Sequence, residues 1–205
     1  MNTQIIDARS SDAIQRALEV LKSGRLVAFP TDTVYGVGSL AFNDKAVESI
    51  YLAKDRPIEK AIPILLGDAD DLDKVASEVP VIARRLAIRF WPGPLTLVIP
   101  KKLTLPESVS ATDTVGVRVP DHPVVRALLR AAGPMAVTSA NVSGQASPST
   151  AEEVLAQLVG RIELILDGGK TPGGLPSTVV DCTGSEPVIL RAGPVALSEI
   201  KSILG

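Results

Sequence analysis

Cysteine and histidine are nearly absent from the sequence, and their scarcity excludes several kinds of site. The 205 residues include one cysteine, Cys182, and one histidine, His122. A single cysteine excludes an internal disulfide, and the two residues together are too few for a zinc site built from cysteine and histidine ligands. Both facts suit a reducing compartment, so we expect a cytoplasmic protein.

Aromatic residues and excess charge are scarce as well. Phe, Trp and Tyr make up 3% of the chain, and the formal net charge is -2 at pH 7. Binding to nucleic acid would therefore need a local basic patch. No apolar run approaches the roughly 18 residues of a membrane helix. The first residues lack the basic and then apolar pattern of a secretory signal, so we expect neither a membrane span nor export.

Hydrophobic residues make up 45% of the chain, and helical and strand patterns alternate along it. An apolar stripe predicts a helix over 13–21, capped by Ser11 or Asp12 and ended by Gly24, and a second helix follows a cap at Asn43. The remaining helices are expected near 80–91, 122–132, 150–158 and 196–204. Strands are expected at 25–29, 61–66, 95–99, 115–118, 135–139, 162–167, 177–181 and 187–191.

Two pairs of predicted strands follow one another without a helix between them. These are 95–99 with 115–118, and the runs near 178 and 188. A parallel crossover needs a long connection, so each pair favours antiparallel pairing within a mixed α/β sheet. No repeat or linker divides the chain, and we expect residues 1–205 to form one domain.

Several familiar motifs fail on inspection. "GVGSLA" at 36–41 fits the dinucleotide pattern, but six residues, 30–35, separate it from the preceding strand. "GGKT" at 168–171 lacks the first glycine of a P-loop. His122 lies between prolines in "PDHP", which favours a turn or helix cap, and Cys182 is expected to be a buried structural thiol.

Polar residues gather at the ends of the apolar runs. They are Thr31, Asp32, Thr33, Lys54, Arg56, Thr114, Arg118, the "TSANVSG" stretch at 138–144, the "PST" stretch at 176–178, and Arg191. Ligands of open α/β sheets bind where strands end, so these residues are expected to line one pocket. Its four cations and many hydroxyls favour an anionic ligand. Alternatively, each cation is a solvated surface charge, and Asp32 and Thr33 only satisfy the amides of their own turn.

Seven stretches together resemble the YrdC/Sua5 family, the threonylcarbamoyl-AMP synthases. They are "FPTDTVYGVG", Lys54-x-Arg56 followed by Pro57, "WPGPLTLVIP", "TVGVRVPDHP", "TSANVSG", "PSTVVD" and "ILRAG", in family order over about residues 10 to 200. The resemblance implies an α/β fold with a strongly twisted, mixed open sheet and flanking helices enclosing a positively charged cavity. It also implies the short, single-domain form of the family.

The activity implied by the resemblance is that of a nucleotidyltransferase. Such an enzyme condenses L-threonine, bicarbonate and ATP to threonylcarbamoyl-AMP and pyrophosphate. The product serves N6-threonylcarbamoyladenosine formation at position 37 of tRNA by a threonylcarbamoyl transferase complex. The sequence leaves open whether this chain contacts tRNA or double-stranded RNA directly. Magnesium should arrive with ATP, since no carboxylate cluster indicates a metal site in the protein.

The resemblance also implies roles for individual residues. The catalytic groups would be Lys54, Arg56, Ser139 and Asn141. Threonine would be bound by Thr31, Arg118 and Ser177, and ATP by Lys54, Thr114, Ser139, Ser147 and Arg191. A carbamate formed on threonine would itself be the nucleophile, so the protein need not supply one.

Two other functions stay open at this stage. One is a module that binds double-stranded RNA or tRNA without turnover, although the sequence offers few aromatic residues for stacking. The other is a carbamoyl-handling domain like that of hydrogenase-maturation proteins, whose usual zinc-finger cysteines are missing here.

Overall fold

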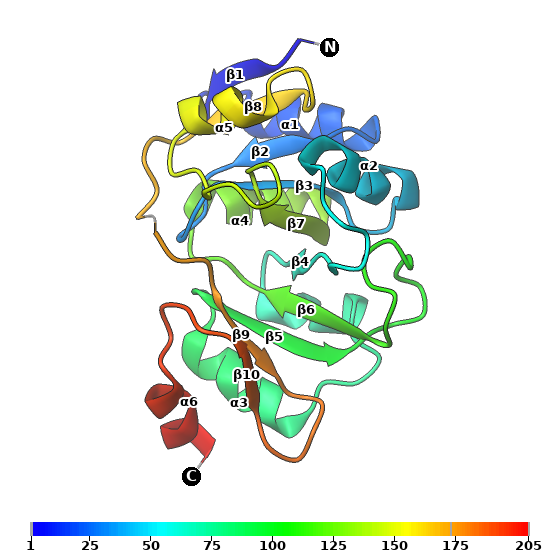
Figure 1. Ribbon diagram of the computed structural model, residues 1–205, viewed down its shortest axis with the longest axis vertical. Coiled ribbons are helices and arrows are strands. Elements are labelled where there is room, and N and C mark those ends of the chain that lie inside the picture. Colours follow the sequence, from blue (N-terminus) through cyan, green and yellow to red (C-terminus); the bar gives the residue numbers. More distant parts are fainter. Residues whose placement is uncertain (1, 173, 205) are drawn as a thin grey trace.

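Ten strands form one open sheet in the computed structural model, which describes residues 2–172 and 174–204 (Figure 1). The strands are β1 Gln4–Asp7, β2 Val27–Phe29, β3 Gly36–Leu40, β4 Ile64–Leu65, β5 Leu95–Pro100, β6 Thr114–Arg118, β7 Met135–Ser139, β8 Leu164–Asp167, β9 Thr178–Asp181 and β10 Val188–Arg191. Their order is β1-β8-β2-β3-β7-β4-β6-β5-β9-β10. In Figure 1 the strand direction turns from nearly horizontal at β1 to steep at β10, as a twisted sheet requires.

Parallel and antiparallel neighbours both occur within this sheet, which confirms the mixed topology predicted from the sequence. The pairs β1–β8, β8–β2, β4–β6 and β5–β9 are parallel, and the other five are antiparallel. Both pairs that lack an intervening helix, β5–β6 and β9–β10, are antiparallel as expected.

Six α-helices and one 3-10 segment flank the sheet in the described residues. They are α1 Ala13–Lys22, α2 Asp44–Lys54, the 3-10 segment Ala69–Lys74, α3 Val81–Phe90, α4 Pro123–Ala132, α5 Ala151–Leu158 and α6 Leu197–Leu204. Helices α1 and α4 pack together, α2 packs on β3 and α5 on β8. No helix in the described ranges is long and apolar enough to cross a membrane.

The helix ends follow the sequence signals in most places. Asn43 caps α2 by accepting a hydrogen bond from the amide of Ala46 at 3.2 Å. Gly24 follows α1 with a φ of +78°, a conformation that glycine adopts without strain. The predicted cap of α1 is wrong, because Asp12 has a helical backbone and its side chain makes no capping bond.

Strand β3 is the main element that the sequence patterns miss. Its residues "GVGSL" contain two glycines and only one β-branched residue, so they give a weak strand signal. The glycines are needed for packing: a Cβ on Gly38 would lie 2.4 Å from the carbonyl oxygen of Ala136 on β7. The short β1 is also missed, and the predicted strand at 61–66 is reduced to the two residues of β4.

The core divides between the two faces of the sheet, as alternation along β2 shows. Val27 and Phe29 pack in one cluster with α1 and α4, while Ala28 packs in a larger cluster that includes Tyr35 and Ile50. Successive side chains of a strand point to opposite faces, so the three residues of β2 together contribute to both cores, two to one and one to the other. The strand is thereby fixed, and with it the loop that follows.

We predict that Gly38→Ala destabilises the protein by about 1–3 kcal/mol, because the new methyl group clashes with the backbone carbonyl of Ala136, which cannot rotate away as a side chain can. Urea unfolding of the variant and the wild type measures the loss. Gly184→Ala is the matched control, because a Cβ there meets only the carbonyl oxygen of Glu186, at 3.6 Å. Equal stability of the two variants would contradict the close approach of β3 and β7.

Candidate functional site

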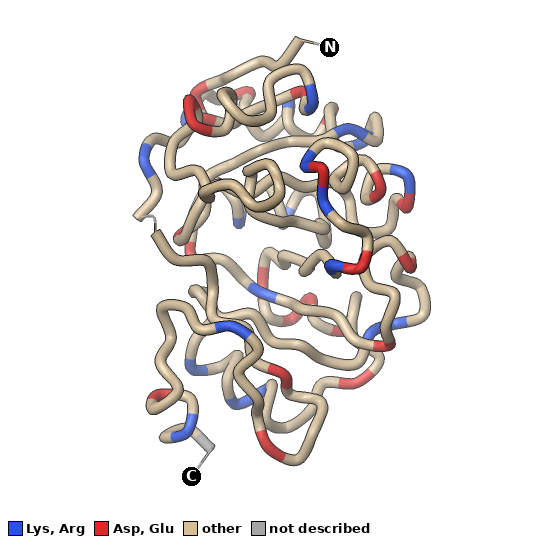
Figure 2. Tube along the Cα trace, in the orientation of Figure 1, with Lys and Arg blue, Asp and Glu red and all other residues tan. Residues whose placement is uncertain are grey.

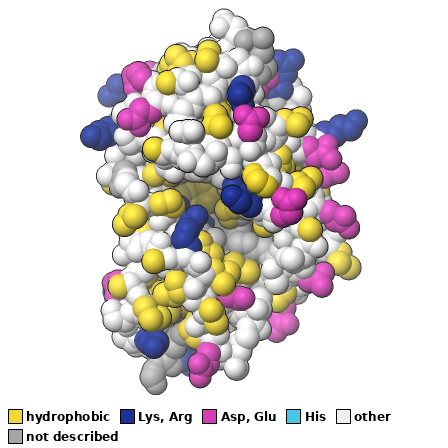
Figure 3. Space-filling view, viewed as in Figure 1, with side chains coloured by type: hydrophobic (Ala, Val, Ile, Leu, Met, Phe, Trp, Pro, Cys, Tyr) yellow, Lys and Arg dark blue, Asp and Glu magenta, His cyan; other side chains and the backbone are white. Residues whose placement is uncertain are grey.

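A cavity of about 320 Å³ opens on one face of the molecule where several strand ends meet. Figure 3 shows this face hollowed near its middle, with Lys or Arg side chains beside the hollow, and Figure 2 shows the basic residues of the chain in the same orientation. The lining comes from the β2–β3 loop, the segment after α2, and β5, β6, β7, β9 and β10. The polar lining residues are Thr31, Thr33, Arg56, Thr96, Arg118, Thr138, Ser139, Ser177 and Arg191.

The β2–β3 loop is held mainly by its own hydroxyl groups. The Oγ1 of Thr31 accepts a hydrogen bond from the Thr33 amide at 3.1 Å and donates to the carbonyl of Val34 at 2.7 Å. Tyr35 ties the loop to the segment after β8, because its hydroxyl donates to the carbonyl of Gly169 at 2.8 Å. The alternative that Asp32 and Thr33 only satisfy the amides of this turn is therefore wrong, because Asp32 pairs with Arg118, Thr33 Oγ1 accepts a hydrogen bond from Arg118, and the turn amide is bound by Thr31. Thr31 and Thr33 both line the cavity.

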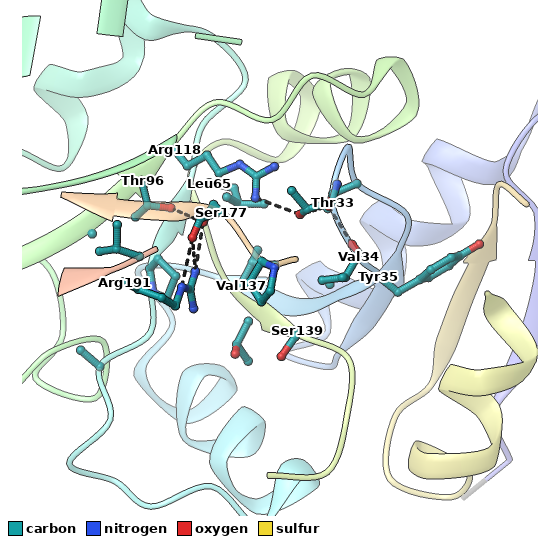
Figure 4. A pocket seen from close by; sticks show the side chains of 18 of the residues that line it. Thr33, Val34, Tyr35, Leu65, Thr96, Arg118, Val137, Ser139, Ser177 and Arg191 are labelled. Carbon is teal, nitrogen blue, oxygen red and sulfur yellow. Dashed lines mark hydrogen bonds between the residues drawn. The ribbon is translucent and has the colours of Figure 1, made fainter. Parts of the chain in front are cut away.

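Arg118 lies at the inner wall of the cavity and is 6% exposed. Its Nε donates to the carbonyl of Gly93 at 3.0 Å and one terminal nitrogen donates to Thr33 Oγ1 at 3.2 Å (Figure 4). The other terminal nitrogen forms an ion pair with Asp32 Oδ1. Burial lowers the pKa of Arg118 and the Asp32 carboxylate opposes that shift, so the guanidinium stays charged.

Arg191 reaches the cavity from β10 and is joined to β9. Its Nε and one terminal nitrogen donate to the carbonyl of Ser177 at 3.0 and 2.8 Å, and the same nitrogen lies 3.1 Å from Ser177 Oγ. Ser177 Oγ in turn bonds Thr96 Oγ1 on β5 at 2.7 Å. Figure 4 shows these three side chains grouped on one side of the cavity, with Thr33 farther along it.

Arg56 supplies the third guanidinium, from the turn after α2. It is half-buried and donates to the carbonyls of Lys60 and Ala61 at 3.1 and 2.8 Å. Burial lowers the pKa of Arg56, and the nearby positive charge of Arg191 lowers it further. The charge of Arg191 acts on the pKa of Arg118 in the same direction. Arg191 is thus close enough to repel both other cations, which is the electrostatic arrangement of an anion site.

Within the described residues, neither Arg56 nor Arg191 forms an ion pair with a carboxylate. Their bonds go to neutral backbone carbonyls, which orient the guanidiniums without cancelling their charge. Part of the positive charge in the cavity is therefore available to a ligand.

Lys54 lies behind the cavity wall and is 1% exposed. Its ammonium donates to the carbonyls of Ser139 and Asn141, and its own carbonyl accepts from the Ser143 amide at 2.7 Å. Burial, together with the charge of Arg56, lowers the pKa of Lys54 to about 7. The last residue of α2 is thus cross-linked to the loop after β7.

The remaining predicted residues lie around the cavity rather than in its lining. The Asn141 amide donates to the carbonyls of Val142 and Gln145 at 2.8 and 3.0 Å and so orders its own loop. Thr114 begins β6 on the face that Gly116 and Arg118 present to the cavity. Ser147 is half-buried in the β7–α5 loop.

Several lining residues were not predicted. Thr96 lies inside β5, where a threonine gives no signal beyond β propensity. Its cavity position follows from the alternation of side chains along β5, and this becomes readable only once the strand register is known. Tyr35 also lines the cavity, whereas its hydroxyl is directed to the segment after β8.

The cavity wall does not fit a resident metal ion. In the described part of the chain, no group of three or more His, Cys, Asp or Glu side chains is placed to hold one. Asp32, the carboxylate next to the cavity loop, is paired with Arg118. Cationic and hydroxyl groups dominate the lining, and these suit an anion rather than a divalent cation.

We predict that the free energy of unfolding rises between pH 7 and 9 more steeply in the wild type than in Lys54→Met. The folded protein releases the Lys54 proton at about 7, below its ordinary value of 10.5. The unfolded chain therefore binds more protons in this window, and stability grows with pH. Urea unfolding at both pH values measures the difference, with the exposed Lys22→Met as control. The 15N shift of Lys54 Nζ reports the pKa directly, and an ordinary value would contradict the prediction.

Comparison with known proteins places this architecture. The family profile that carries the names Sua5, YciO and YrdC, with the description "telomere recombination", matches residues 19–193. A Pyrococcus abyssi protein named threonylcarbamoyl-AMP synthase is 44% identical over 194 residues, which cover 94% of this chain and 57% of that protein. A Bacillus subtilis protein of the same name is 43% identical over 195 residues, covering 94% of this chain and 56% of that one.

A solved structure agrees with the sequence relatives. The crystal structure of P. abyssi Sua5 complexed with L-threonine matches with a TM-score of 0.95 at 43% identity, covering 99% of this chain and 61% of that chain. The present chain thus spans somewhat more than half the length of the relatives described here. Because the family profile matches most of the sequence and the fold agrees, the chain belongs to the Sua5/YciO/YrdC family.

Proposed function

We propose that the protein is an L-threonylcarbamoyladenylate synthase, which condenses L-threonine, bicarbonate and ATP to threonylcarbamoyl-AMP and pyrophosphate. The observation that carries the proposal is the convergence of Arg56, Arg118 and Arg191 on one cavity. Among residues 2–172 and 174–204, Arg56 and Arg191 have no carboxylate partner. A carbamate and a triphosphate are both anions, and such a site reduces their mutual repulsion. The names of the P. abyssi and B. subtilis relatives support the same activity.

Each residue has a role in this proposal. Arg118, at the inner wall and bonded to Thr33, would bind the carboxylate of threonine, and Thr31 and Ser177 would contact the same substrate. Arg191 and Ser139 would contact the nucleotide, with Arg56 near the reacting phosphate. Thr114 and Ser147 would bind outer parts of ATP. For Lys54 and Asn141 we propose that they position the Ser139 loop, since their donor groups are bonded to it.

The reaction follows without a protein nucleophile. The amine of threonine takes up bicarbonate with loss of water, and one oxygen of the resulting carbamate attacks the α-phosphorus. The bond from that phosphorus to the pyrophosphate oxygen breaks, and pyrophosphate leaves. Positioning of the two anions and stabilisation of charge in the transition state would then be the protein's contribution.

The setting of the reaction is part of the same proposal. Magnesium would enter as the ATP complex and therefore as part of the substrate. A single domain, 1–205, would suffice, because the strands of one sheet and the loops that connect them carry the lining residues. We propose a cytoplasmic location, which suits a free, buried Cys182, and transfer of the labile adenylate to a tRNA-modifying complex.

Pyrophosphate release should require ATP, threonine and bicarbonate together, because the attacking oxygen exists only after threonine and bicarbonate combine. A coupled pyrophosphate assay with each component omitted in turn measures this, and mass spectrometry identifies the adenylate. Turnover without bicarbonate would contradict the proposal. So would equal turnover with carbamoyl phosphate in place of threonine and bicarbonate, which would favour a carbamoyl-handling domain.

Replacing Arg191 with Gln should lower kcat about 10²–10³-fold, the usual effect of losing one preorganised donor. Arg118→Lys should be similarly impaired, because lysine cannot form the same fork, while it retains a charge beside Asp32. Arg9→Gln is the control, since Arg9 pairs with Asp7 at an exposed site. Wild-type activity in Arg191→Gln would contradict the assignment.

An RNA-binding module without turnover is the competing function, and its supporting observation is the same positive cavity. It predicts tRNA binding that weakens steeply with salt and does not depend on ATP or threonine. Filter binding at 50 and 200 mM salt, run beside the pyrophosphate assay, separates the two functions.

A further inference from the structure

The two family motifs, Lys54-x-Arg56 and Ser139-x-Asn141, are joined directly to each other. Lys54 binds the second motif and the loop after it through two groups. Its ammonium donates to the carbonyls of Ser139 and Asn141, and its backbone carbonyl accepts a hydrogen bond from the Ser143 amide. Any shift in the end of α2 is therefore passed to the loop that carries Ser139. These contacts matter to the site because Arg56 and Ser139 line the cavity, although Lys54, Asn141 and Ser143 do not.

The turn that carries Lys54 and Arg56 has an unusual backbone. Asp55, between them, has φ 51° and ψ 42°, and it is the one non-glycine residue of the described ranges with positive φ. Asp tolerates this left-handed conformation better than most residues, yet glycine adopts it with less strain. Backbone conformation alone therefore does not explain why this position is Asp and not Gly.

Arg161, in the turn between α5 and β8, supplies that reason. One of its terminal nitrogens donates to Asp55 Oδ2 at 2.6 Å and to the carbonyl of Ala53 at 3.2 Å. It therefore holds the residues on both sides of Lys54. This contact faces a second cavity behind α2, whose charged lining also includes Arg25 and Glu163, themselves paired at 3.7 Å.

Gln157, on the last turn of α5, holds the other motif. Its Oε1 accepts from the Val142 amide at 3.0 Å, and its Nε2 donates to the carbonyl of Ala146 at 3.1 Å. The side chain thus spans the loop that follows Ser139. Gln157 and Arg161 are four residues apart and come from the same end of α5.

We propose that Gln157 and Arg161 form a brace at the end of α5 that fixes both motifs in one geometry, and that Asp55 is the anchor point for Arg161. This proposal rests on the proposed function, since it concerns the same site. Neither residue lines the cavity, so they act as positioning residues through Lys54 and the Ser139 loop.

Stability alone does not account for the Arg161 contact. The side chains of Arg161 and Asp55 are 41% and 62% exposed, and exposed ion pairs contribute little to folding. A small displacement of positioned groups, by contrast, can lower a rate about 100-fold. The brace should therefore affect turnover far more than the unfolding temperature.

The test compares Arg161→Gln, Asp55→Gly and their double variant in the pyrophosphate assay. We expect each single variant to lose about tenfold in kcat/KM. The double variant should lose no more, because both substitutions remove the same contact between Arg161 and Asp55. Asp55→Gly should also unfold no earlier than the wild type, since glycine suits the left-handed backbone. Arg25→Gln, at the same second cavity, is the matched control and should keep wild-type turnover.

Hydrogen exchange gives a readout that does not depend on activity. The Ser143 amide, which donates to the Lys54 carbonyl, should exchange faster in Arg161→Gln and in Gln157→Ala than in the wild type or Arg25→Gln. Turnover and exchange within twofold of the wild type in both variants would overturn the brace. If the wild type itself makes no adenylate, the proposed function fails, and Ser143 exchange alone then decides whether the brace exists.

Discussion

The site depends on holding three guanidinium groups near one another although their charges repel. Arg56, Arg118 and Arg191 come from segments far apart in the sequence, and each is fixed by at least one backbone carbonyl. Carbonyl partners orient a guanidinium but leave its charge uncancelled. The repulsion is therefore stored in the fold, and a bound polyanion would relieve it. Stabilisation of this arrangement must come from the apolar packing of the sheet on both faces.

That packing explains why β3 contains glycines. The tight approach of β3 to β7 at Gly38 brings the β2–β3 loop beside the end of β7. Thr31 and Thr33 on that loop then face the cavity together with Ser139. The same approach leaves no room for a Cβ at Gly38, so a residue that looks dispensable in the sequence allows the close packing of β3 against β7.

The sequence predicts the helices and most of the strands, and it predicts part of the cavity lining. Polar residues at the ends of apolar runs meet in one place because strand ends of an α/β sheet share an edge, a rule that needs no exact register. Strand β3 escapes prediction because its glycines serve a tertiary contact and not a local preference. The burial of Lys54 escapes as well, since a lysine at a helix end is usually solvated, and its two carbonyl partners lie 85 and 87 residues away.

Asp32 shows most clearly that the sequence around a residue does not reveal its tertiary partner. In the sequence it is either a pocket residue or a turn-forming Asp, whereas in the fold it pairs with the most buried of the three cavity arginines. An arginine buried without a partner would be costly, and a carboxylate that fully occupied it would block an anionic ligand. Asp32 binds one terminal nitrogen of Arg118, while Gly93 and Thr33 take two further donors of its five N–H groups. The guanidinium is thus stabilised in the absence of ligand and still retains donors for one. A carboxylate ligand would share Arg118 with Asp32 and would bind through geometry more than through net charge, which favours a small, well-fitted amino acid over a larger polyanion at this end of the cavity.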